Sequence, residues 1–175
     1  MRKICLLLYF CGMLLACKKD VRSLTVVTSE TQVVVRPRVG NSLPAPVQLL
    51  VTAYATECKE LGGTLVAGKS QPEIQTVDLD GDGKPDFILY PRNLQCSASA
   101  SVFCPNAGCE IRIAVSGNDY EDPLFILGGT PVVKDSAVEI EVQHFNCKDA
   151  AQDETCVSKV TWDGEKLIQS FAVRQ

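Results

Sequence analysis

Four aspartates lie close together in the segment VDLDGDGKPDFIL, which runs from Val77 to Leu89. Asp78, Asp80, Asp82 and Asp86 take positions 1, 3, 5 and 9 of the loop inside this segment. Carboxylates this close repel one another, and a segment between two apolar runs tolerates them when a hard cation neutralises their charge. Alternate residues of a tight turn bring their carboxylate oxygens to one centre. This donor set favours calcium, which takes about six to eight oxygen ligands.

The residues between the aspartates fit the same interpretation. Gly81 and Gly83 permit the backbone angles of a tight wrap. The backbone carbonyl of Lys84 is predicted to be a further ligand, and Asp86 closes the site from the start of the next strand. The loop does not fit an EF-hand. An EF-hand has a glutamate at the twelfth position, where this loop has Leu89, and it is flanked by helices, whereas the flanks of this loop are strand-like. An acidic β-turn without an ion remains the alternative.

The pattern D-x-D-x-D-G-x-x-D, followed at once by an apolar strand, resembles the calcium loops of FG-GAP and VCBS repeat proteins, the integrin-propeller type. The matching residues are Asp78, Asp80, Asp82, Gly83 and Asp86. The resemblance implies a calcium site. It does not imply a propeller, because a propeller needs several copies and the loop occurs once.

The N-terminus has the pattern of an export signal. Residues 1–16 combine a short basic start with an apolar run that is too short for a membrane span of ~20 residues, which predicts a signal peptide. The run ends in LLAC, which is similar to the lipobox of bacterial lipoproteins and implies cleavage before Cys17. Palmitate and the other acyl chains on Cys17 would then anchor the chain stably. An ordinary cleavage site near Ala16 beside an incidental cysteine is the alternative.

The residue after the lipobox cysteine bears on the location. Lys18 stands where the inner-membrane retention signal of enterobacterial lipoproteins has aspartate, so the resemblance implies the periplasm and an outer-membrane anchor in a Gram-negative host. The net charge is −4, from 17 basic and 21 acidic residues, and the basic residues form no cluster. Nucleic acid is therefore excluded as a partner. We expect the membrane, through the lipid, and a protein of the cell envelope as partners.

Six of the nine cysteines remain once the signal peptide and Cys17 are set aside: Cys58, Cys96, Cys104, Cys109, Cys147 and Cys156. An even number in an exported domain predicts up to three disulfides, with fifteen pairings open. Proximity along the chain favours pairing 147 with 156 and 104 with 109, which leaves 58 to pair with 96. Zinc is disfavoured, because the chain has no C-x-x-C pair and a single histidine.

A single domain, residues 46–175, is predicted to follow a proline-containing tether at 17–45. Apolar residues at spacings of three and four predict a helix from Pro46 to Leu61, with a buried stripe of Val47, Leu50, Val51, Tyr54, Ala55, Cys58 and Leu61. Pro46 suits its first turn, and Gly62 suits a left-handed cap.

Short runs of strand-forming residues follow the helix. Strands are predicted at 64–67, 73–79, 86–90, 110–116, 123–127, 137–143, 157–162 and 166–173, and two more precede the domain at 24–28 and 32–36. Asp163 and Gly164 predict a hairpin between the last two. Sequential strands with short connections favour an antiparallel meander with the helix packed on one face, so the fold class is α+β.

Residues 93–108 form the longest irregular stretch, which is either a binding surface or a crossover held by disulfides. Catalysis is not expected. His144 has no nucleophile motif to serve, and the paired carboxylates all lie in the metal loop.

The order of several features in the chain resembles that in small exported proteins of alphaproteobacteria. These features are the aspartate loop, a cysteine, a Ser/Ala-rich loop with Phe103 and Cys104, then Gly108 and Cys109, and finally Trp162 to Gly164. This resemblance implies the fold and the location, and it names no activity. The sequence therefore predicts a calcium-binding, disulfide-stabilised envelope lipoprotein that acts as a non-catalytic binding or assembly module. A periplasmic inhibitor or immunity protein against an envelope-targeting enzyme is the alternative.

Overall fold

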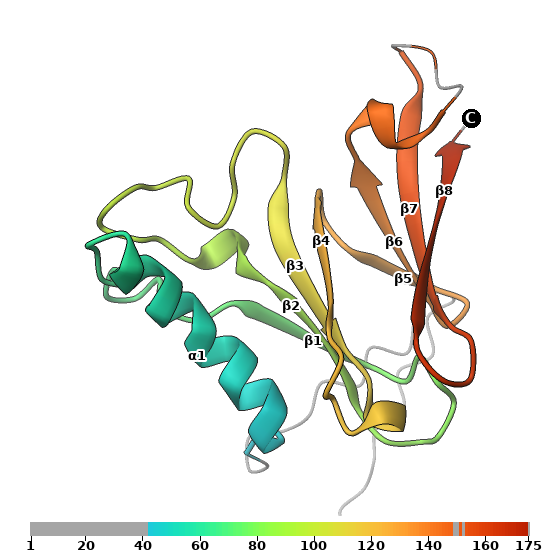
Figure 1. Ribbon diagram of the computed structural model, residues 1–175, viewed down its shortest axis with the longest axis horizontal. Helices are drawn as coiled ribbons and strands as arrows, with labels where there is room; N and C mark the ends of the chain where they lie inside the picture. The colour runs from blue at the N-terminus through green and yellow to red at the C-terminus, as the bar shows by residue number, and fades with distance from the viewer. Residues whose placement is uncertain (1–41, 149–150, 152, 175) are drawn as a thin grey trace, which may run out of the picture. The chain divides into compact units, whose positions relative to one another are not determined.

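The computed structural model describes residues 42–148, 151 and 153–174 (Figure 1). The predicted signal peptide, Cys17, most of the tether and the strands predicted at 24–28 and 32–36 lie outside the described residues. Within the described part of the chain, no helix is both long and apolar enough to cross a membrane.

One α-helix and eight strands make up the regular structure of the described residues. The helix is α1 (Ala45–Glu60), and the first sheet contains β1 (Glu73–Val77), β2 (Asp86–Tyr90), β3 (Cys109–Ala114) and β4 (Leu124–Gly128). The second sheet contains β5 (Val132–Lys134), β6 (Ala137–Val142), β7 (Thr155–Trp162) and β8 (Leu167–Arg174). Each sheet follows chain order and is antiparallel throughout. The α+β class with disulfides is therefore correct in outline.

The prediction of a single meander is wrong, because the chain divides into two four-stranded meanders after β4. The division occurs at Gly128 and Gly129. A Cβ atom on Gly128 would lie 2.4 Å from Ile140 Cγ2 and 2.6 Å from the carbonyl oxygen of Glu141, so only glycine lets β4 pass this close to β6. The Gly129 N–H then donates to the carbonyl of Glu141. Local strand patterns do not reveal such a contact between distant segments.

The first sheet lies between the helix and the second sheet (Figure 1). All five residues of β2 are buried because both faces of this strand are covered. Ile88 packs in the core between the two sheets, together with Ile111, Ile140 and Val160. Phe87 and Leu89 point to the opposite face and pack with α1. Strand periodicity of two thus divides the apolar residues of β2 between two cores.

Helix α1 begins and ends close to the predicted positions. Proline occupies its first turn, and Gly62 follows its end with a φ of +80°, as the left-handed cap requires. Val47, Tyr54 and Cys58 are buried, as the stripe predicted. Ala55 and Leu61 are exposed, which corrects their predicted burial. Leu61 lies just past the end of α1, and the buried face of the helix is narrower than the predicted stripe.

Arg112 of β3 fastens the helix to the first sheet. Its side chain is 1% exposed and lies under α1, where the guanidinium stands 3.7 Å from the centre of the Tyr54 ring. It donates to the Leu50 carbonyl at 2.9 Å and pairs with the carboxylates of Glu57 and Glu110. Burial is tolerated because every part of the charged group has a partner. The pattern of alternating apolar residues gave no indication of this role.

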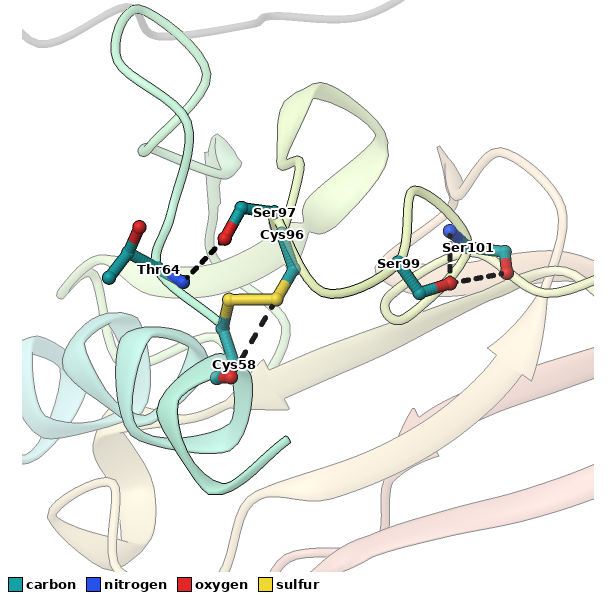
Figure 2. Close-up of a disulfide and its surroundings, with 6 residues drawn as sticks. All are labelled: Cys58, Thr64, Cys96, Ser97, Ser99 and Ser101. Atoms are coloured by element: carbon teal, nitrogen blue, oxygen red, sulfur yellow. Dashed lines mark hydrogen bonds between the residues drawn. A yellow bond between two sulfur atoms is a disulfide. The ribbon is translucent and has the colours of Figure 1, made fainter. Parts of the chain in front are cut away.

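The three disulfides join the pairs that chain proximity favours: Cys58–Cys96, Cys104–Cys109 and Cys147–Cys156. The first links the last turn of α1 to the segment that follows β2 (Figure 2). The irregular stretch 93–108 is partly a core element, because Phe103 is 3% exposed and packs edge-on against Tyr54.

Two strand predictions need correction. The run 64–67 forms only an isolated bridge, between Leu65 and Cys96, because turns at Gly62 and Gly68, both at positive φ, leave only a short run between them. Strand β5 was missed. Its turn to β6 uses Asp135 and Ser136 with positive φ values of 49° and 55°, a hairpin conformation that the sequence does not signal with glycine.

Candidate metal site

The aspartate loop connects β1 to β2 and is fixed at both ends by strand pairing. Val77 pairs with Asp86 in the ladder, so residues 78–85 must reverse the chain between adjacent strand ends. Gly81 and Gly83 have φ values of +77° and +79°, in the region that glycine occupies without strain. The predicted role of the two glycines is confirmed.

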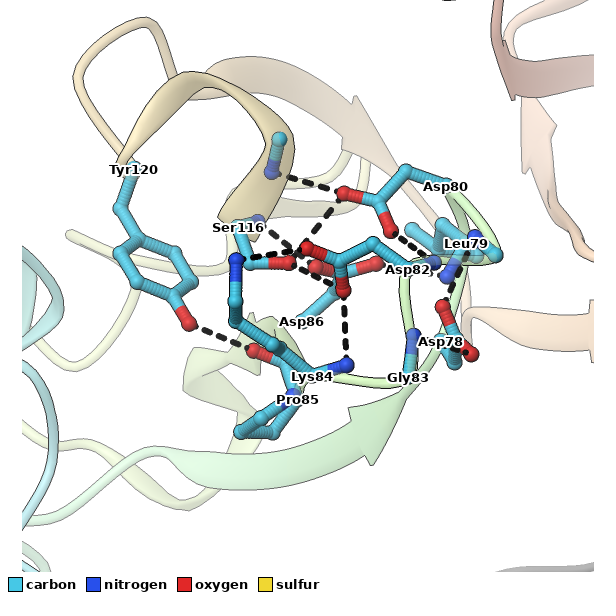
Figure 3. A network of polar contacts seen from close by, with 12 residues as sticks. Asp78, Leu79, Asp80, Asp82, Gly83, Lys84, Pro85, Asp86, Ser116 and Tyr120 are labelled. Atoms are coloured by element: carbon cyan, nitrogen blue, oxygen red, sulfur yellow. Dashed lines mark hydrogen bonds and ion pairs between the residues drawn. The ribbon is translucent and has the colours of Figure 1, made fainter.

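Three of the four predicted aspartates come together. One carboxylate oxygen from each of Asp78, Asp80 and Asp86 lies within 4.8 Å of the other two. Figure 3 shows the three side chains in the loop. Oxygen atoms about 2.3–2.6 Å from a common calcium ion can be separated by this distance. The donor set is therefore all oxygen, of the kind that a hard cation prefers.

Asp86 is the buried member of the group, with no exposed surface. Its two oxygens accept the N–H groups of Leu79, at 2.6 Å, and of Ser116, at 2.7 Å. Burial raises the pKa of the Asp86 carboxyl, and the two backbone hydrogen bonds oppose that rise. The side chain thus joins the aspartate loop to the connection between β3 and β4.

Asp78 and Asp80 are held by backbone N–H groups of the loop itself. The Asp78 oxygens accept from Gly81 at 2.8 Å and from Gly83 at 3.2 Å. One oxygen of Asp80 accepts from Asp82 N–H at 3.0 Å. Each carboxylate is oriented by these bonds and keeps lone pairs for a further partner, since a carboxylate has about four acceptor positions.

Asp82 does not join the group of three. Its carboxylate forms an ion pair of 2.9 Å with the ammonium of Lys84, and it accepts from the Ser116 hydroxyl at 3.0 Å. The hydrogen bond from Lys84 is the main reason that the pKa of Asp82 falls below its usual value. Lys84 is well exposed, and among the described residues no other basic side chain pairs with the loop. The group of Asp78, Asp80 and Asp86 therefore has no cationic side chain of its own.

A second segment, which the sequence did not indicate, completes the wall of the site. It is the short 3-10 turn of Ser116–Asn118 after β3. The Ser116 hydroxyl donates to Asp80 at 3.2 Å, and the Gly117 N–H donates to the same oxygen at 2.7 Å (Figure 3). No sequence signal links this turn to the loop, because the two lie more than 30 residues apart and touch only after β2 pairs with β3.

Two aromatic residues support this turn. The Tyr120 hydroxyl donates to the Pro85 carbonyl at 2.8 Å, although Tyr120 itself has a positive φ of 65°, which is rare for a bulky residue. A Cβ atom on Gly117 would come within 2.9 Å of the ring of Trp162 and within 2.8 Å of Asp80. Trp162, the one tryptophan of the chain, therefore lies beside the turn that binds Asp80.

His144 lies apart from this network. It begins a 3-10 turn after β6, is exposed, and packs its ring against Phe145. The carboxylates of the loop accept from backbone N–H groups and from the Ser116 hydroxyl, and His144 lies outside these contacts. Holding a cation is the chemistry that this arrangement fits best.

Comparison of the chain with protein-family models, with curated proteins and with solved structures gave no significant match.

Proposed function

We propose that this chain is a calcium-binding, disulfide-stabilised domain of the bacterial envelope that acts as a non-catalytic binding or assembly module. The observation that carries the calcium assignment is the convergence of Asp78, Asp80 and Asp86, with the buried Asp86 at its base. Three carboxylates within this distance repel one another unless a cation lies between them. Calcium would contribute by neutralising the group and by fixing the aspartate loop against the Ser116–Asn118 turn.

The envelope assignment rests on different residues. Three disulfides fit an oxidising compartment. The signal-peptide pattern of residues 1–16 and the lipobox-like LLAC supply the route of export and the lipid on Cys17. A module of this kind would present the two-sheet domain from the membrane through residues 17–45.

Calcium is expected to raise the thermal stability of the oxidised protein. An ion that binds only the folded state at a concentration 100 times its Kd adds about 2.7 kcal/mol to the free energy of unfolding. For a domain of this size that corresponds to a rise in Tm of roughly 5–10 °C. Melting followed by Trp162 fluorescence, in calcium, magnesium or EDTA, measures the effect next to the site. Calcium should act more strongly than magnesium, which requires tighter octahedral geometry.

Asp80→Asn tests whether the ion binds at this loop. The variant should lose most of the calcium-dependent rise in Tm. Its Tm in EDTA should fall modestly, because the amide nitrogen cannot accept the backbone N–H that one Asp80 oxygen receives from Asp82 or from Gly117. The comparison is therefore between calcium and EDTA within each variant. Asp153→Asn, at an exposed aspartate outside the loop, is the matched control and should keep the full rise. A parent protein that melts identically in calcium and EDTA contradicts the proposal, as does an Asp80→Asn variant with an undiminished rise.

Cys17→Ser is expected to release the protein from the membrane. Without the thiol no acyl chain can be attached, and the described residues contain no helix that could cross the membrane. The measurement is the distribution of the protein between membrane and soluble periplasmic fractions. Cys17→Ser chains that still sediment with the membrane would refute lipid anchoring while leaving the calcium assignment intact.

A further inference from the structure

Strand β8 forms one edge of the second sheet. It pairs with β7 along its whole length, from Leu167 opposite Trp162 to Arg174 opposite Thr155. Within the described part of the chain, no strand pairs with its other side. Figure 1 shows β8 in dark red at the rim of the sheet. Its outward backbone N–H and carbonyl groups therefore form a row that an extended strand can pair with.

This edge lacks the features that usually prevent pairing. At eight residues β8 is the longest edge strand, because β1 and β4 have five residues and β5 has three. It contains neither proline nor lysine. Its one charged residue, Arg174, is paired across the sheet with Glu139 and Glu141. A long edge without proline or unpaired charge can accept a further strand from another chain.

The side chains of β8 show what kind of strand fits. Phe171 is opposite the buried Ser158 and lies on the same face as the core residue Val160. Yet Phe171 is 44% exposed, so the first sheet does not cover this part of the face. It also borders a cavity of about 430 Å³ between β8 and residues 146–148. An aromatic side chain from a neighbouring strand would cover this exposed surface.

We propose that the occupant of this edge is β8 of a second copy of the chain, paired antiparallel about a two-fold axis at Phe171. A two-fold axis perpendicular to the sheet keeps the inner faces together, so each residue must pair with one on the same face. Centring on Phe171 sets the two phenyl rings opposite each other, and such cross-strand aromatic pairs are favourable. Gln169 then faces Val173, and Ser170 faces Ala172.

Charge disfavours one of the two neighbouring registers. In the Phe171-centred pairing, Arg174 lies opposite Ile168 of the other copy, and no like charges meet. A shift that centres the pair on Ser170 would set Arg174 opposite Lys166, which places two cations across one pair. The shift in the other direction, centred on Ala172, would set Arg174 opposite Ser170, and it is disfavoured because Phe171 would then face Val173 and the two phenyl rings would no longer pair.

The size of the contact sets its strength. Eight residues a side are fewer than the roughly 20–30 a side of a stable interface. The dimer is accordingly weak and dependent on concentration in solution. Attachment of both copies to one membrane surface would raise their effective concentration and favour pairing.

Sedimentation equilibrium of the whole mature chain in density-matched detergent tests the proposal. The mass should rise from one copy towards two as the protein concentration increases. Phe171→Lys and Phe171→Glu should each weaken dimerisation at least about tenfold, because each puts two like charges at the axis, and an equimolar mixture should restore it. Leu49→Lys, at an exposed apolar residue of α1 far along the chain from β8, should leave the dimer unchanged. A parent monomeric at all concentrations, or a mixture that fails to restore the dimer, overturns the proposal.

Photo-crosslinking in intact cells identifies the occupant. With a photoreactive phenylalanine at position 171, the expected product has twice the mass of the chain and contains position 171 from both copies. A product of single-chain mass that joins position 171 to residues 24–36 would show that the chain's own N-terminal segment occupies the edge. That product, or a product with a different protein, overturns the assignment to a second copy.

Discussion

Asp86→Ala is expected to lower the free energy of unfolding by about 2–5 kcal/mol, even when calcium is removed with EDTA. The loss follows from two buried N–H groups, of Leu79 and Ser116, that both donate to this carboxylate. Each orphaned donor costs about 1–3 kcal/mol, because no water replaces the lost acceptor in a site with no exposed surface. Calcium should no longer stabilise the variant, because the buried ligand at the base of the site is gone.

Chemical denaturation in EDTA and in calcium separates these two effects of Asp86→Ala. Asp82→Ala is the matched control, since Asp82 belongs to the same loop but bonds to the exposed Lys84 and lies outside the group of three. In EDTA the control should lose far less stability than Asp86→Ala, as expected for an exposed ion pair. Equal losses for the two variants would mean that Asp86 does not join the loop to the β3–β4 connection as its hydrogen bonds indicate.

The aspartate loop was largely predictable because its determinants are local. The alternation of carboxylates, the two glycines at positive φ and the flanking strands all lie within residues 77–90. The disulfide pairs were predictable for a similar reason, since two of them close short loops and the third then follows by elimination. Asp82 shows the limit of this reasoning. Its place in the spacing pattern is correct, but an adjacent lysine attracts its side chain.

Features that depend on contacts between distant strands were not predictable. Arg112 alternates with apolar residues like an ordinary exposed position, and only the arrival of α1 above β3 makes it a buried anchor. The sequence around Ser116 and Gly117 is typical of a polar turn, and these residues reach Asp80 only because β2 and β3 pair. The second sheet arises in the same way, from the close passage of Gly128 beside β6. These contacts determine the two-sheet architecture and the part of the candidate site that Ser116 and Gly117 form.

Replacing both Cys58 and Cys96 with serine, which removes their disulfide, is expected to lower the free energy of unfolding by about as much as the most destabilising single substitution in the domain. The bond closes a separation of 38 residues, for which chain entropy alone predicts a loss of about 4 kcal/mol. Both sulfur atoms also lie in the core beneath α1, with the residues 0% and 2% exposed, so the serine hydroxyls would enter an apolar site.

The double Cys147→Ser and Cys156→Ser variant is the comparison that isolates the effect on the helix. That bond closes only nine residues, for which the same entropy argument predicts a loss of about 2.6 kcal/mol in the free energy of unfolding. It joins the segment after β6 to β7, within the second sheet, and does not touch α1. Loss of Cys58–Cys96 should therefore lower the Tm further and should speed hydrogen exchange in α1 before exchange in β6 and β7. Arg112 would still hold α1 at Leu50 and at Glu57, so the faster exchange should begin beyond Glu57, at the C-terminal end of the helix. A uniform increase in hydrogen-exchange rates across α1 and both sheets would instead mean that the disulfide only restricts the unfolded chain and does not stabilise the helix locally.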